Sequence, residues 1–323
     1  MLTDLFNRKF NYLRLSITDV CNFKCNYCLP DGYECDTSRD FLTLNEIQNM
    51  VSAFAKLGVE KIRITGGEPG LRKDLPAIIR IVANTQGINK VALTTNGFNL
   101  YENVTKWHQA GLQQLNVSLD SLNASQFRLI TGSNKHQQIM NGIEQAISLG
   151  IKVKINAVLL KQHNLNEMSE FLNWLKTTPV TLRFIELMQT NDNGDFFKQQ
   201  HIAGTTLINT IVDMGWQPVP QEKTAGPALE FQHAQYAGKI GFIMPYSKDF
   251  CRTCNRLRVS ATGNLHQCLF SDEGSNLRPL TQSVSQQAEL MTWLQQQSLL
   301  KGETHQLHQH HSGATKHLAM LGG

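Results

Sequence analysis

Residues 43–69 read TLNEIQNMVSAFAKLGVEKIRITGGEP, a helical pattern followed by a strand pattern and a glycine-rich turn. Apolar residues recur at helical spacing over Leu44–Leu57, and Thr43 with Glu46 three residues later forms a capping-box pattern. A glycine then caps the helix, and Lys61–Thr65 has the length and β-branched content of a buried strand. The stretch predicts one helix–strand unit of an α/β protein.

The same unit recurs up to about residue 215. Further strands are predicted over Leu13–Thr18, Val91–Thr95, Leu115–Leu119, Lys152–Leu160 and Thr181–Leu187. Further helices are predicted over Lys73–Ala83, Tyr101–Ala110, Ile139–Ser148 and Leu165–Lys176. No strand opens into a G-x-G-x-x-G turn, which disfavours a dinucleotide-binding fold, and about six units are too few for a closed eight-fold barrel. We therefore expect an open, partial TIM-type barrel with functional groups at the C-terminal ends of its strands.

The alternation of strand and helix stops after about residue 215. Short strands are predicted over Lys239–Met244, Arg256–Ala261 and Leu265–Phe270, the last two joined by a turn at Gly263. We therefore expect a barrel over residues 1–215 and a second region over residues 216–323 laid against it. The end of the chain, from Gln295, is rich in Gln and His and predicts a solvated tail.

Composition limits the classes of function. With 323 residues, 41% hydrophobic and 17% charged, the chain has the composition of a globular protein. It has no apolar run of the ~18 residues needed to span a bilayer and no apolar leader at the start, so we expect a cytoplasmic protein without a membrane partner. A net charge of +4 permits an anionic ligand but is too small to indicate nucleic-acid binding.

The first of two cysteine groups is Cys21, Cys25 and Cys28, spaced C-x3-C-x2-C. Without an export signal, a disulfide framework is not expected. Three thiolates can hold three irons of a cubane cluster and leave the fourth iron open to a small molecule. A zinc site completed by a ligand from elsewhere is the alternative, but zinc loops more often use C-x2-C pairs.

The second group is Cys251, Cys254 and Cys268, spaced C-x2-C-x13-C. Three ligands again suggest a cluster with an open iron, here facing a substrate. The alternative is zinc completed by a histidine such as His266. The seventh cysteine, Cys35, is treated as incidental.

Cations accompany these cysteines. Arg256 and Arg258 follow the second group directly and, in a strand, point the same way, so together they can bind phosphates. The predicted barrel strands carry six more: Arg14, Lys61, Arg63, Lys152, Lys154 and Arg183. Buried charges are costly unless they are paired or face a polar lumen. The pattern predicts a basic lumen that binds a multiply charged anion such as a triphosphate.

The first cysteine motif, with Tyr27 before its last cysteine, resembles the signature of radical S-adenosylmethionine (SAM) enzymes. Gly66-Gly67-Glu68-Pro69 is similar to the glycine-rich strand end of that family. The resemblance implies a 4Fe-4S cluster whose open iron binds SAM and whose electron releases a 5′-deoxyadenosyl radical. It also implies that the glycines admit the methionyl amino group of SAM and that Glu68 supplies negative charge beside it.

Over nearly its full length the chain resembles the radical SAM GTP 3′,8-cyclases, which begin molybdenum cofactor biosynthesis. The resemblance rests on CNFKCNYC (21–28), KIRITGGEP (61–69), LTTNG (93–97), NVSLD (116–120), LRFIELM (182–188), CNRLRVS (254–260), GNLHQCLF (263–270) and the terminal diglycine. It implies GTP contacts from Arg14, Arg63, Thr94, Lys154, Arg256 and Arg258, with Lys61 and Arg183 adding to the phosphate contacts. It implies SAM contacts from Tyr27, Gly67, Ser118 and Met188, and a catalytic role for Gly322 and Gly323 in a tail that reaches the active site.

The resemblance further implies two 4Fe-4S clusters, the second binding the edge of the guanine ring. The expected reaction takes a hydrogen atom from ribose C3′ and joins C3′ to C8, which gives (8S)-3′,8-cyclo-7,8-dihydroguanosine 5′-triphosphate. The expected partners are a second copy in a homodimer, a reductase or flavodoxin-type electron donor, and a cyclic pyranopterin monophosphate synthase that takes the product.

Two departures from the family pattern are noted. Gly70 stands where relatives carry a bulky apolar residue and is expected to loosen the turn, and Lys152 is an alternative to Lys154.

Two other functions remain open. A radical enzyme that modifies a peptide would usually carry more C-terminal cysteines and needs no ring of cations. An RNA-binding module held by zinc would need more than 8% aromatic residues and a larger net charge.

Overall fold

The computed structural model describes residues 1–34, 40–221, 224–271, 273–309, 312–313 and 321. The strands in these residues are β1 (Tyr12–Ser16), β2 (Lys61–Thr65), β3 (Lys90–Thr95), β4 (Gln114–Ser118), β5 (Lys152–Leu159), β6 (Thr181–Glu186), β7 (Gln217–Pro218), β8 (Leu229–Gln232), β9 (Lys239–Ile243), β10 (Arg256–Val259), β11 (Asn264–His266) and β12 (Ser275–Asn276). The six strands predicted before residue 190 are all confirmed, with bounds that agree to within about two residues.

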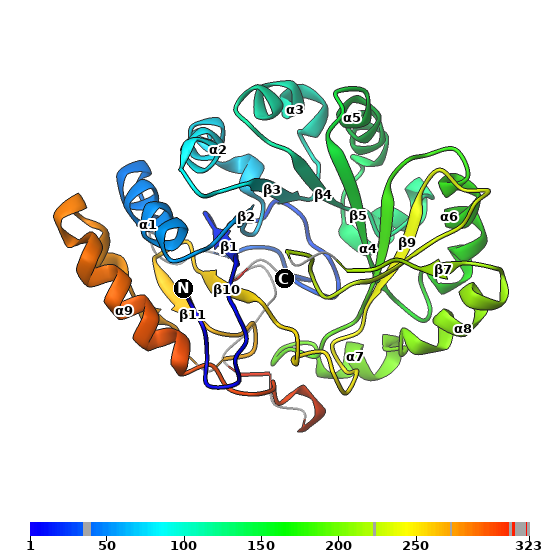
Figure 1. Cartoon of the computed structure of the whole chain (residues 1–323). Coiled ribbons are helices and arrows are strands. Elements are labelled where there is room, and N and C mark those ends of the chain that lie inside the picture. Colours follow the sequence, from blue (N-terminus) through cyan, green and yellow to red (C-terminus); the bar gives the residue numbers. More distant parts are fainter. Residues whose placement is uncertain (35–39, 222–223, 272, 310–311, 314–320, 322–323) are drawn as a thin grey trace.

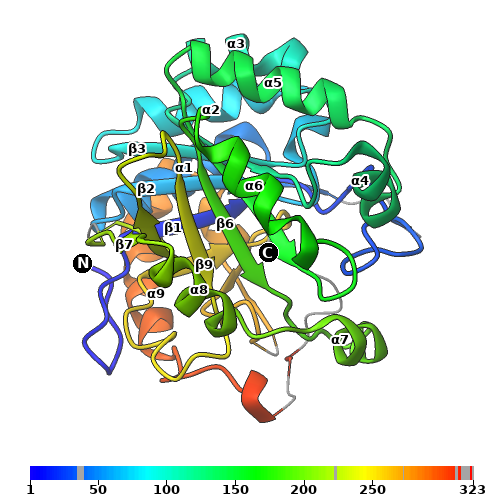
Figure 2. The same ribbon diagram turned by 90° about the vertical axis from the view of Figure 1, so that its right-hand side faces the viewer.

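All these strands belong to one sheet, in the order β12-β11-β10-β1-β2-β3-β4-β5-β6-β9-β8-β7. The run from β10 to β9 is parallel throughout, and antiparallel strands flank it at both ends. Figure 1 shows the sheet curving around a central space, and Figure 2 shows the same strands from the side. No pairing joins β12 to β7 in the described residues, so the barrel is open, as expected.

The helices of the described chain are α1 (Leu44–Lys56), α2 (Leu75–Asn84), α3 (Leu100–Gln109), α4 (Ala124–Thr131), α5 (His136–Ser148), α6 (Met168–Leu175), α7 (Gly194–Gln200), α8 (Thr205–Asp213) and α9 (Gln287–Leu299). In Figure 1, α1, α2, α3, α5 and α6 cover the outer side of the curved sheet. The capping box of α1 is confirmed: Thr43 Oγ1 accepts from the Glu46 amide at 3.3 Å, and Glu46 Oε2 accepts from the Thr43 amide at 2.8 Å. None of the described helices is long and apolar enough to cross a membrane.

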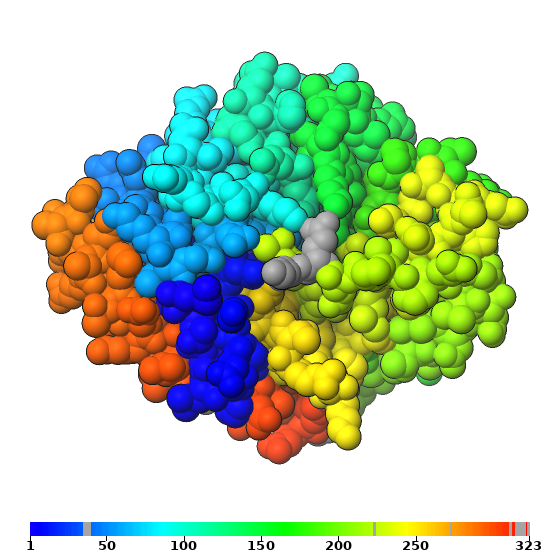
Figure 3. All heavy atoms as spheres, in the orientation of Figure 1, coloured from blue at the N-terminus to red at the C-terminus, as the bar shows by residue number. Residues whose placement is uncertain are grey.

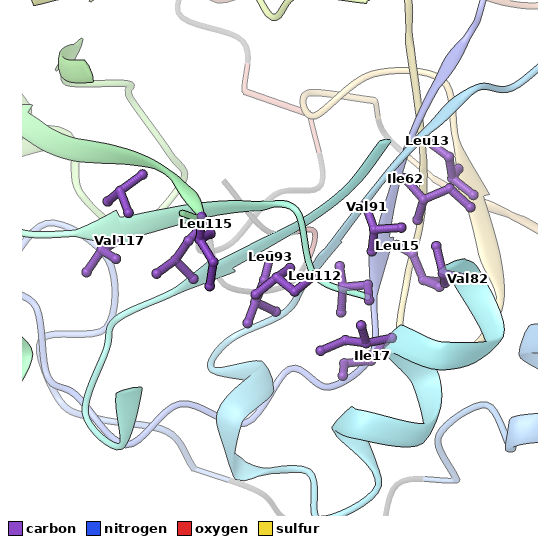
Figure 4. Close-up of a cluster of buried hydrophobic side chains, with 14 of the residues drawn as sticks. Leu13, Leu15, Ile17, Ile62, Val82, Val91, Leu93, Leu112, Leu115 and Val117 are labelled. Atoms are coloured by element: carbon purple, nitrogen blue, oxygen red, sulfur yellow. The ribbon is translucent and has the colours of Figure 1, made fainter. Parts of the chain in front are cut away.

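The strands separate their side chains by face. The outward positions are apolar and pack beneath the helices, as Figure 4 shows for Leu13, Leu15, Ile62, Leu93 and Val117, each fully buried. Successive strand residues point to opposite faces, so the residues between them point into the barrel. The alternation visible in KIRIT therefore places the core outside the sheet and the cations inside it.

The C-terminal strands complete this sheet. β10 lies parallel beside β1, and β9 lies parallel beside β6, so residues beyond 215 extend both edges of the barrel. The expected hairpin is confirmed, with β10 antiparallel to β11 around Gly263, whose φ is +89°. The expectation of a region laid against the barrel is corrected, because these strands lie in the sheet itself. The division at residue 215 stays a prediction.

The expected solvated tail is confirmed only in part among its described residues, because Gln306, His308 and Gln309 are exposed but three other side chains are buried. Lys301, His305 and Leu307 are 5%, 8% and 1% exposed, and His305 packs against Phe250 and Phe270. Figure 3 shows the N-terminal segment, in blue, between the yellow and red parts of the C-terminal third. Phe250 and Phe270, which come earlier in the chain, bury His305 although the stretch around it is polar in composition.

The turn after β2 is held by a close backbone crossing. The Gly67 amide donates to Thr18 O at 2.9 Å, and the Glu68 amide donates to Val20 O at 2.7 Å. A Cβ atom on Gly66 would lie 2.3 Å from Thr18 O, and one on Gly67 would lie 2.4 Å from Val20 O. Both positions therefore require glycine, and the turn fixes the segment that leads into the first cysteine group.

This crossing generates a stability prediction. Gly66→Ala should lower the free energy of unfolding by about 2 kcal/mol, because the added methyl group must push the Thr18 carbonyl away. Gly194→Ala is the matched control, since a Cβ atom there meets nothing within 4 Å. Chemical denaturation followed by circular dichroism makes the comparison, and equal stability of the two variants would contradict the role of the crossing.

Candidate active site

The inward faces of the strands form a basic lumen. Sheet register places Tyr12 level with Lys61 and Arg256, and Arg14 level with Arg63 and Arg258. Arg14, Lys61, Arg63, Arg183 and Arg258 are each at most 9% exposed. The structure therefore brings together the cations that the sequence placed in separate strands.

Two cavities occupy this lumen. One, of about 260 Å³, is lined by Tyr12, Arg14, Arg256, Arg258 and the three cysteines of the second group. The other, of about 360 Å³, lies toward the N-terminal ends of the strands and is lined by Lys61, Lys152, Lys154 and Glu230. Arg63 and Arg183 line both cavities, so the two spaces adjoin at these side chains.

Few groups of the protein neutralise the lumen. Glu230 pairs with Lys154 at 2.5 Å, and Arg183 donates to Asn116 and Asn156 at 2.7 and 2.6 Å. Burial, reinforced by neighbouring cations, lowers the pKa of Lys61 and of Lys154 to about 8 each. Both Lys152 and Lys154 line the cavity, but Lys152 is exposed whereas Lys154 is half-buried, which favours Lys154 as the residue that meets a ligand.

Several buried donors of the lumen have no hydrogen-bond partner among the described residues. They are Arg14 Nε, Arg63 Nε, Arg183 Nε, Thr94 Oγ1 and Tyr12 Oη. A buried donor without an acceptor destabilises a fold by about 1–3 kcal/mol. These donors suit an acceptor-rich, negatively charged ligand, and a polyphosphate meets that requirement.

The first cysteine group lies on the loop after β1. Backbone hydrogen bonds fasten this loop to the end of α4: Lys24 N to Thr131 O and Asn26 N to Ile130 O, both at 3.0 Å. Burial, with Asp120 and the other two thiols nearby, raises the pKa of Cys25 well above its ordinary value. A bound cation would reverse that effect, since metal ligands are thiolates.

Two buried carboxyl groups support this end of the lumen. Asp120, after β4, accepts from Tyr27 Oη at 2.9 Å and from the Val158 amide at 2.8 Å. Burial raises the pKa of Asp120 to about 6. A SAM contact from Tyr27 would thus come from its ring or main chain, because its hydroxyl is already used.

Glu68 is the other buried carboxyl group. It accepts from the amides of Gly70 and Asn96 at 2.7 and 2.6 Å and from Thr95 Oγ1 at 2.7 Å, and burial raises its pKa to about 7. Its described contacts hold the turn to the end of β3. The expectation that Gly70 loosens the turn stays a prediction; a Cβ atom there would lie 2.7 Å from both Glu68 Oε1 and Asn99 Oδ1.

The second cysteine group lies at the other end of the strands. Cys251 and Cys254 precede β10, and Cys268 follows β11, which runs antiparallel to it. The expectation that functional groups gather at the C-terminal strand ends therefore holds for the first group but not for the second. Burial would raise the pKa of Cys254, but Arg256, 3.6 Å from its Sγ, and Lys301 lower it to about 6.

The donor chemistry of both groups suits iron–sulfur clusters. Each supplies three thiols from one neighbourhood, and the thiols are close enough to influence one another's pKa. Within the described residues, no three Cys, His, Asp or Glu side chains are arranged as a site for a single metal ion. The surroundings of His266 do not favour the zinc alternative. Its Nδ1 lies 3.5 Å from Ser271 Oγ, and its Nε2 lies so close to Gly274 that a Cβ atom on that glycine would be 2.4 Å away.

Sequence reasoning missed Arg8, which fastens the second cysteine loop. Its guanidinium donates to Cys251 O at 3.1 Å, Glu303 O at 2.7 Å and Gly302 O at 2.6 Å, and it pairs with Asp4. The three carbonyl partners lie 243 to 295 residues away in sequence, and no local motif marks them.

Comparisons with known proteins agree with this geometry. Residues 15–175 match the model of the Radical SAM superfamily, and residues 180–307 match Molybdenum Cofactor Synthesis C. GTP 3′,8-cyclase of Tolumonas auensis is 53% identical over 324 residues, covering 100% of this chain and 96% of the relative. GTP 3′,8-cyclase of Yersinia pestis is 50% identical over 323 residues, covering 100% and 99%.

The chain belongs to the GTP 3′,8-cyclase family.

Solved structures show the radical SAM fold expected for a GTP 3′,8-cyclase. Streptococcus suis SuiB bound to S-adenosylmethionine superposes with a TM-score of 0.63 at 14% identity, covering 84% of this chain. This chain spans 64% of the length of that protein. HydG, a maturase of the [FeFe]-hydrogenase, gives a TM-score of 0.50 at 17% identity, covering 62% of this chain and 47% of the other. At these identities the likeness concerns the fold alone.

The residues that the cyclase family pattern assigns to SAM lie around the first cysteine loop. Gly67 follows β2, Ser118 ends β4 and Met188 follows β6, all at C-terminal strand ends. Cys35, Gly322 and Gly323 lie outside the described residues. Leu321, just before the diglycine, is buried and its carbonyl accepts from Arg258 Nη1 at 3.0 Å.

The contacts of Arg8 generate a prediction for the second loop. In Arg8→Ala, backbone amides around Cys251 and around Gly302 should exchange with deuterium several-fold faster, because three carbonyl groups lose their shared donor. Arg252→Ala is the matched control, since its side chain is 76% exposed. Hydrogen exchange read by mass spectrometry makes the test, and unchanged protection near Cys251 in Arg8→Ala would contradict the fastening role.

Proposed function

We propose that this chain cyclises GTP to (8S)-3′,8-cyclo-7,8-dihydroguanosine 5′-triphosphate by radical SAM chemistry, the first step of molybdenum cofactor biosynthesis. The observation that carries the proposal is the lumen itself. Buried cations, with donors that lack acceptors, lie between two cysteine groups at opposite ends of the strands. Membership of the cyclase family supports the same substrate.

Cys21, Cys25 and Cys28 would hold one 4Fe-4S cluster, and Cys251, Cys254 and Cys268 a second. When bound, the first cluster and SAM supply a 5′-deoxyadenosyl radical that removes the hydrogen atom from ribose C3′. Tyr27, Gly67, Ser118 and Met188 would contact SAM, which their position around the first loop supports. Gly322 and Gly323 are proposed to assist from the tail, because the preceding Leu321 is held by Arg258.

The lumen side chains would orient GTP between the clusters. The second cysteine group would anchor the guanine, and Arg14, Arg63, Arg256 and Arg258, which line the cavity beside it, would hold the phosphates where this cavity meets the adjoining one. Lys61, Lys154 and Arg183 line the adjoining cavity and would bind the phosphates, with Thr94 as a further contact. A primary carbon radical attacks any nearby C–H bond, so selectivity requires one hydrogen held close and water excluded.

The proposed partners follow from the family resemblance. They are a second copy of the chain in a homodimer, a reductase or flavodoxin-type electron donor, and a cyclic pyranopterin monophosphate synthase that consumes the product. A peptide substrate is disfavoured by the lumen, because a neutral peptide cannot satisfy so many buried cations.

Turnover under anaerobic conditions tests the reaction. The chain, reconstituted with iron and sulfide, should convert GTP and SAM with dithionite into 5′-deoxyadenosine and a cyclised nucleotide, both read by mass spectrometry. Arg258→Ala should lower kcat/KM for GTP roughly 10- to 100-fold, because a charged hydrogen bond contributes about 1.5–3 kcal/mol. Arg252→Ala should leave it unchanged. If the wild-type chain cleaved SAM without needing GTP and formed no cyclised product, the assignment of GTP as the substrate would be contradicted.

Iron analysis tests the number of clusters. Reconstituted wild-type chain should hold about eight irons, four for each three-cysteine group. Cys254→Ser and Cys28→Ser should each remove about half, and only Cys254→Ser should retain slow cleavage of SAM by dithionite. Full iron content in Cys254→Ser would show that the second group holds no cluster.

A further inference from the structure

We propose that Tyr12 is a substrate-binding residue whose hydroxyl donates a hydrogen bond to a phosphate oxygen of the bound nucleotide. The inference rests on the proposed function and extends it, because neither the sequence pattern nor the family resemblance assigned a role to Tyr12. The argument uses the position of the ring, the state of the hydroxyl and the chemistry of its neighbours.

Tyr12 lies on the inner face of β1 and lines the cavity that holds the second cysteine group. Register places it between Lys61 of β2 and Arg256 of β10. Its side chain is 1% exposed, and its hydroxyl has no hydrogen-bond partner among the described residues. A phenol in this position is buried without the partner that a buried tyrosine usually has.

The ring and the hydroxyl have separable tasks. Lys61 Nζ lies 4.8 Å and Arg63 Cζ 5.4 Å from the ring centroid, so the ring contacts two cations of the lumen by its π face. A phenylalanine ring would keep these contacts and the packing. The hydroxyl is therefore not needed to hold the lumen together.

The neighbours of the hydroxyl define what it can bind. The charged groups that interact with it are Arg14 on its own strand, Lys61 and Arg63 on β2, Arg183 on β6, and Arg256 and Arg258 on β10. These side chains carry donors and no acceptor, so the hydroxyl cannot donate to them. The acceptor that would reach it is the anion that the same cations bind, and for GTP that anion is the phosphate chain.

The same environment makes the hydroxyl sensitive to pH. Burial would raise its pKa, but Arg63, Lys61, Arg14 and Arg256 together lower it to about 7. Above that pH the free protein carries a tyrosinate, which cannot donate and which repels phosphate. Nucleotide binding then requires uptake of a proton, so the contribution of the hydroxyl should be full below about pH 7 and decline above it. Lys61 also titrates, near pH 8, and because Tyr12 raises its pKa, loss of the phenol would move that titration to lower pH.

Tyr12→Phe tests the proposal. Binding is measured anaerobically on the reconstituted holoenzyme without SAM or reductant, at about pH 6 and about pH 8.5, values on either side of the phenol's titration. The ligands are GTP, inorganic tripolyphosphate and guanosine. Tyr101→Phe is the matched control, because Tyr101 is 52% exposed on α3.

At about pH 6, Tyr12→Phe should bind GTP and tripolyphosphate roughly 5- to 20-fold more weakly than wild type, as expected for one hydrogen bond to a charged group. Guanosine binding should be unchanged. At about pH 8.5 the variant should bind GTP as tightly as wild type or more tightly, because the proton that wild type must take up weakens its binding about 30-fold there. A merely structural role for Tyr12 would give a loss independent of pH.

Three results would overturn the proposal: equal binding by both chains at about pH 6, a loss confined to guanosine, or a loss that does not change with pH. Failure of the wild-type chain to bind GTP at all would instead overturn the proposed function. If Tyr12→Phe does not fold, 3-fluorotyrosine at position 12 serves as the second test. Its more acidic phenol should move the midpoint of the pH dependence to lower pH, and an unmoved midpoint would exclude Tyr12 as its source.

Discussion

The structure depends on an excess of buried positive charge inside an open barrel. Inward positions of the parallel strands carry arginine and lysine, and among the described residues Glu230 is the carboxylate that pairs with them in the adjoining cavity. Burying cations costs several kcal/mol each unless they are compensated. The fold tolerates them because its hydrophobic core lies on the other face of the sheet, under the helices, where a conventional barrel would also fill its interior with apolar side chains. What remains inside is a site organised in advance for a polyanion.

The two cysteine groups are held in place by different interactions at the two ends of this lumen. At the first, backbone crosses backbone so closely that Gly66 and Gly67 tolerate no Cβ atom, and buried carboxyl groups clamp the turn and the loop. At the second, Arg8 gathers carbonyl groups from the cysteine loop and from residues 302–303. The cavities between the two groups are lined by cations and leave the middle of the lumen for a substrate.

Tyr12 shows how such a lumen can use a neutral group. Its ring contacts cations, while its hydroxyl stays among donors and has no acceptor in the described residues. A phosphate chain would relieve both the charge excess and the unpartnered phenol. Substrate binding would therefore be coupled to the protonation state of the site, not only to its net charge.

The sequence alone determined the strands of the first 190 residues and their helices except α4, because their periodicities are local and each of these elements signals its own ends. It also determined that cations point inward, since alternation within a strand is a property of the strand, and that two groups of three thiols exist. Tertiary structure alone decided that residues after 215 enter the same sheet, and that the second cysteine group lies at the opposite strand ends. It alone buried His305 and Leu307 and gave Arg8 its carbonyl partners. These features depend on contacts between segments tens to hundreds of residues apart or on strand pairing across the sheet, and neither produces a periodic pattern in the sequence.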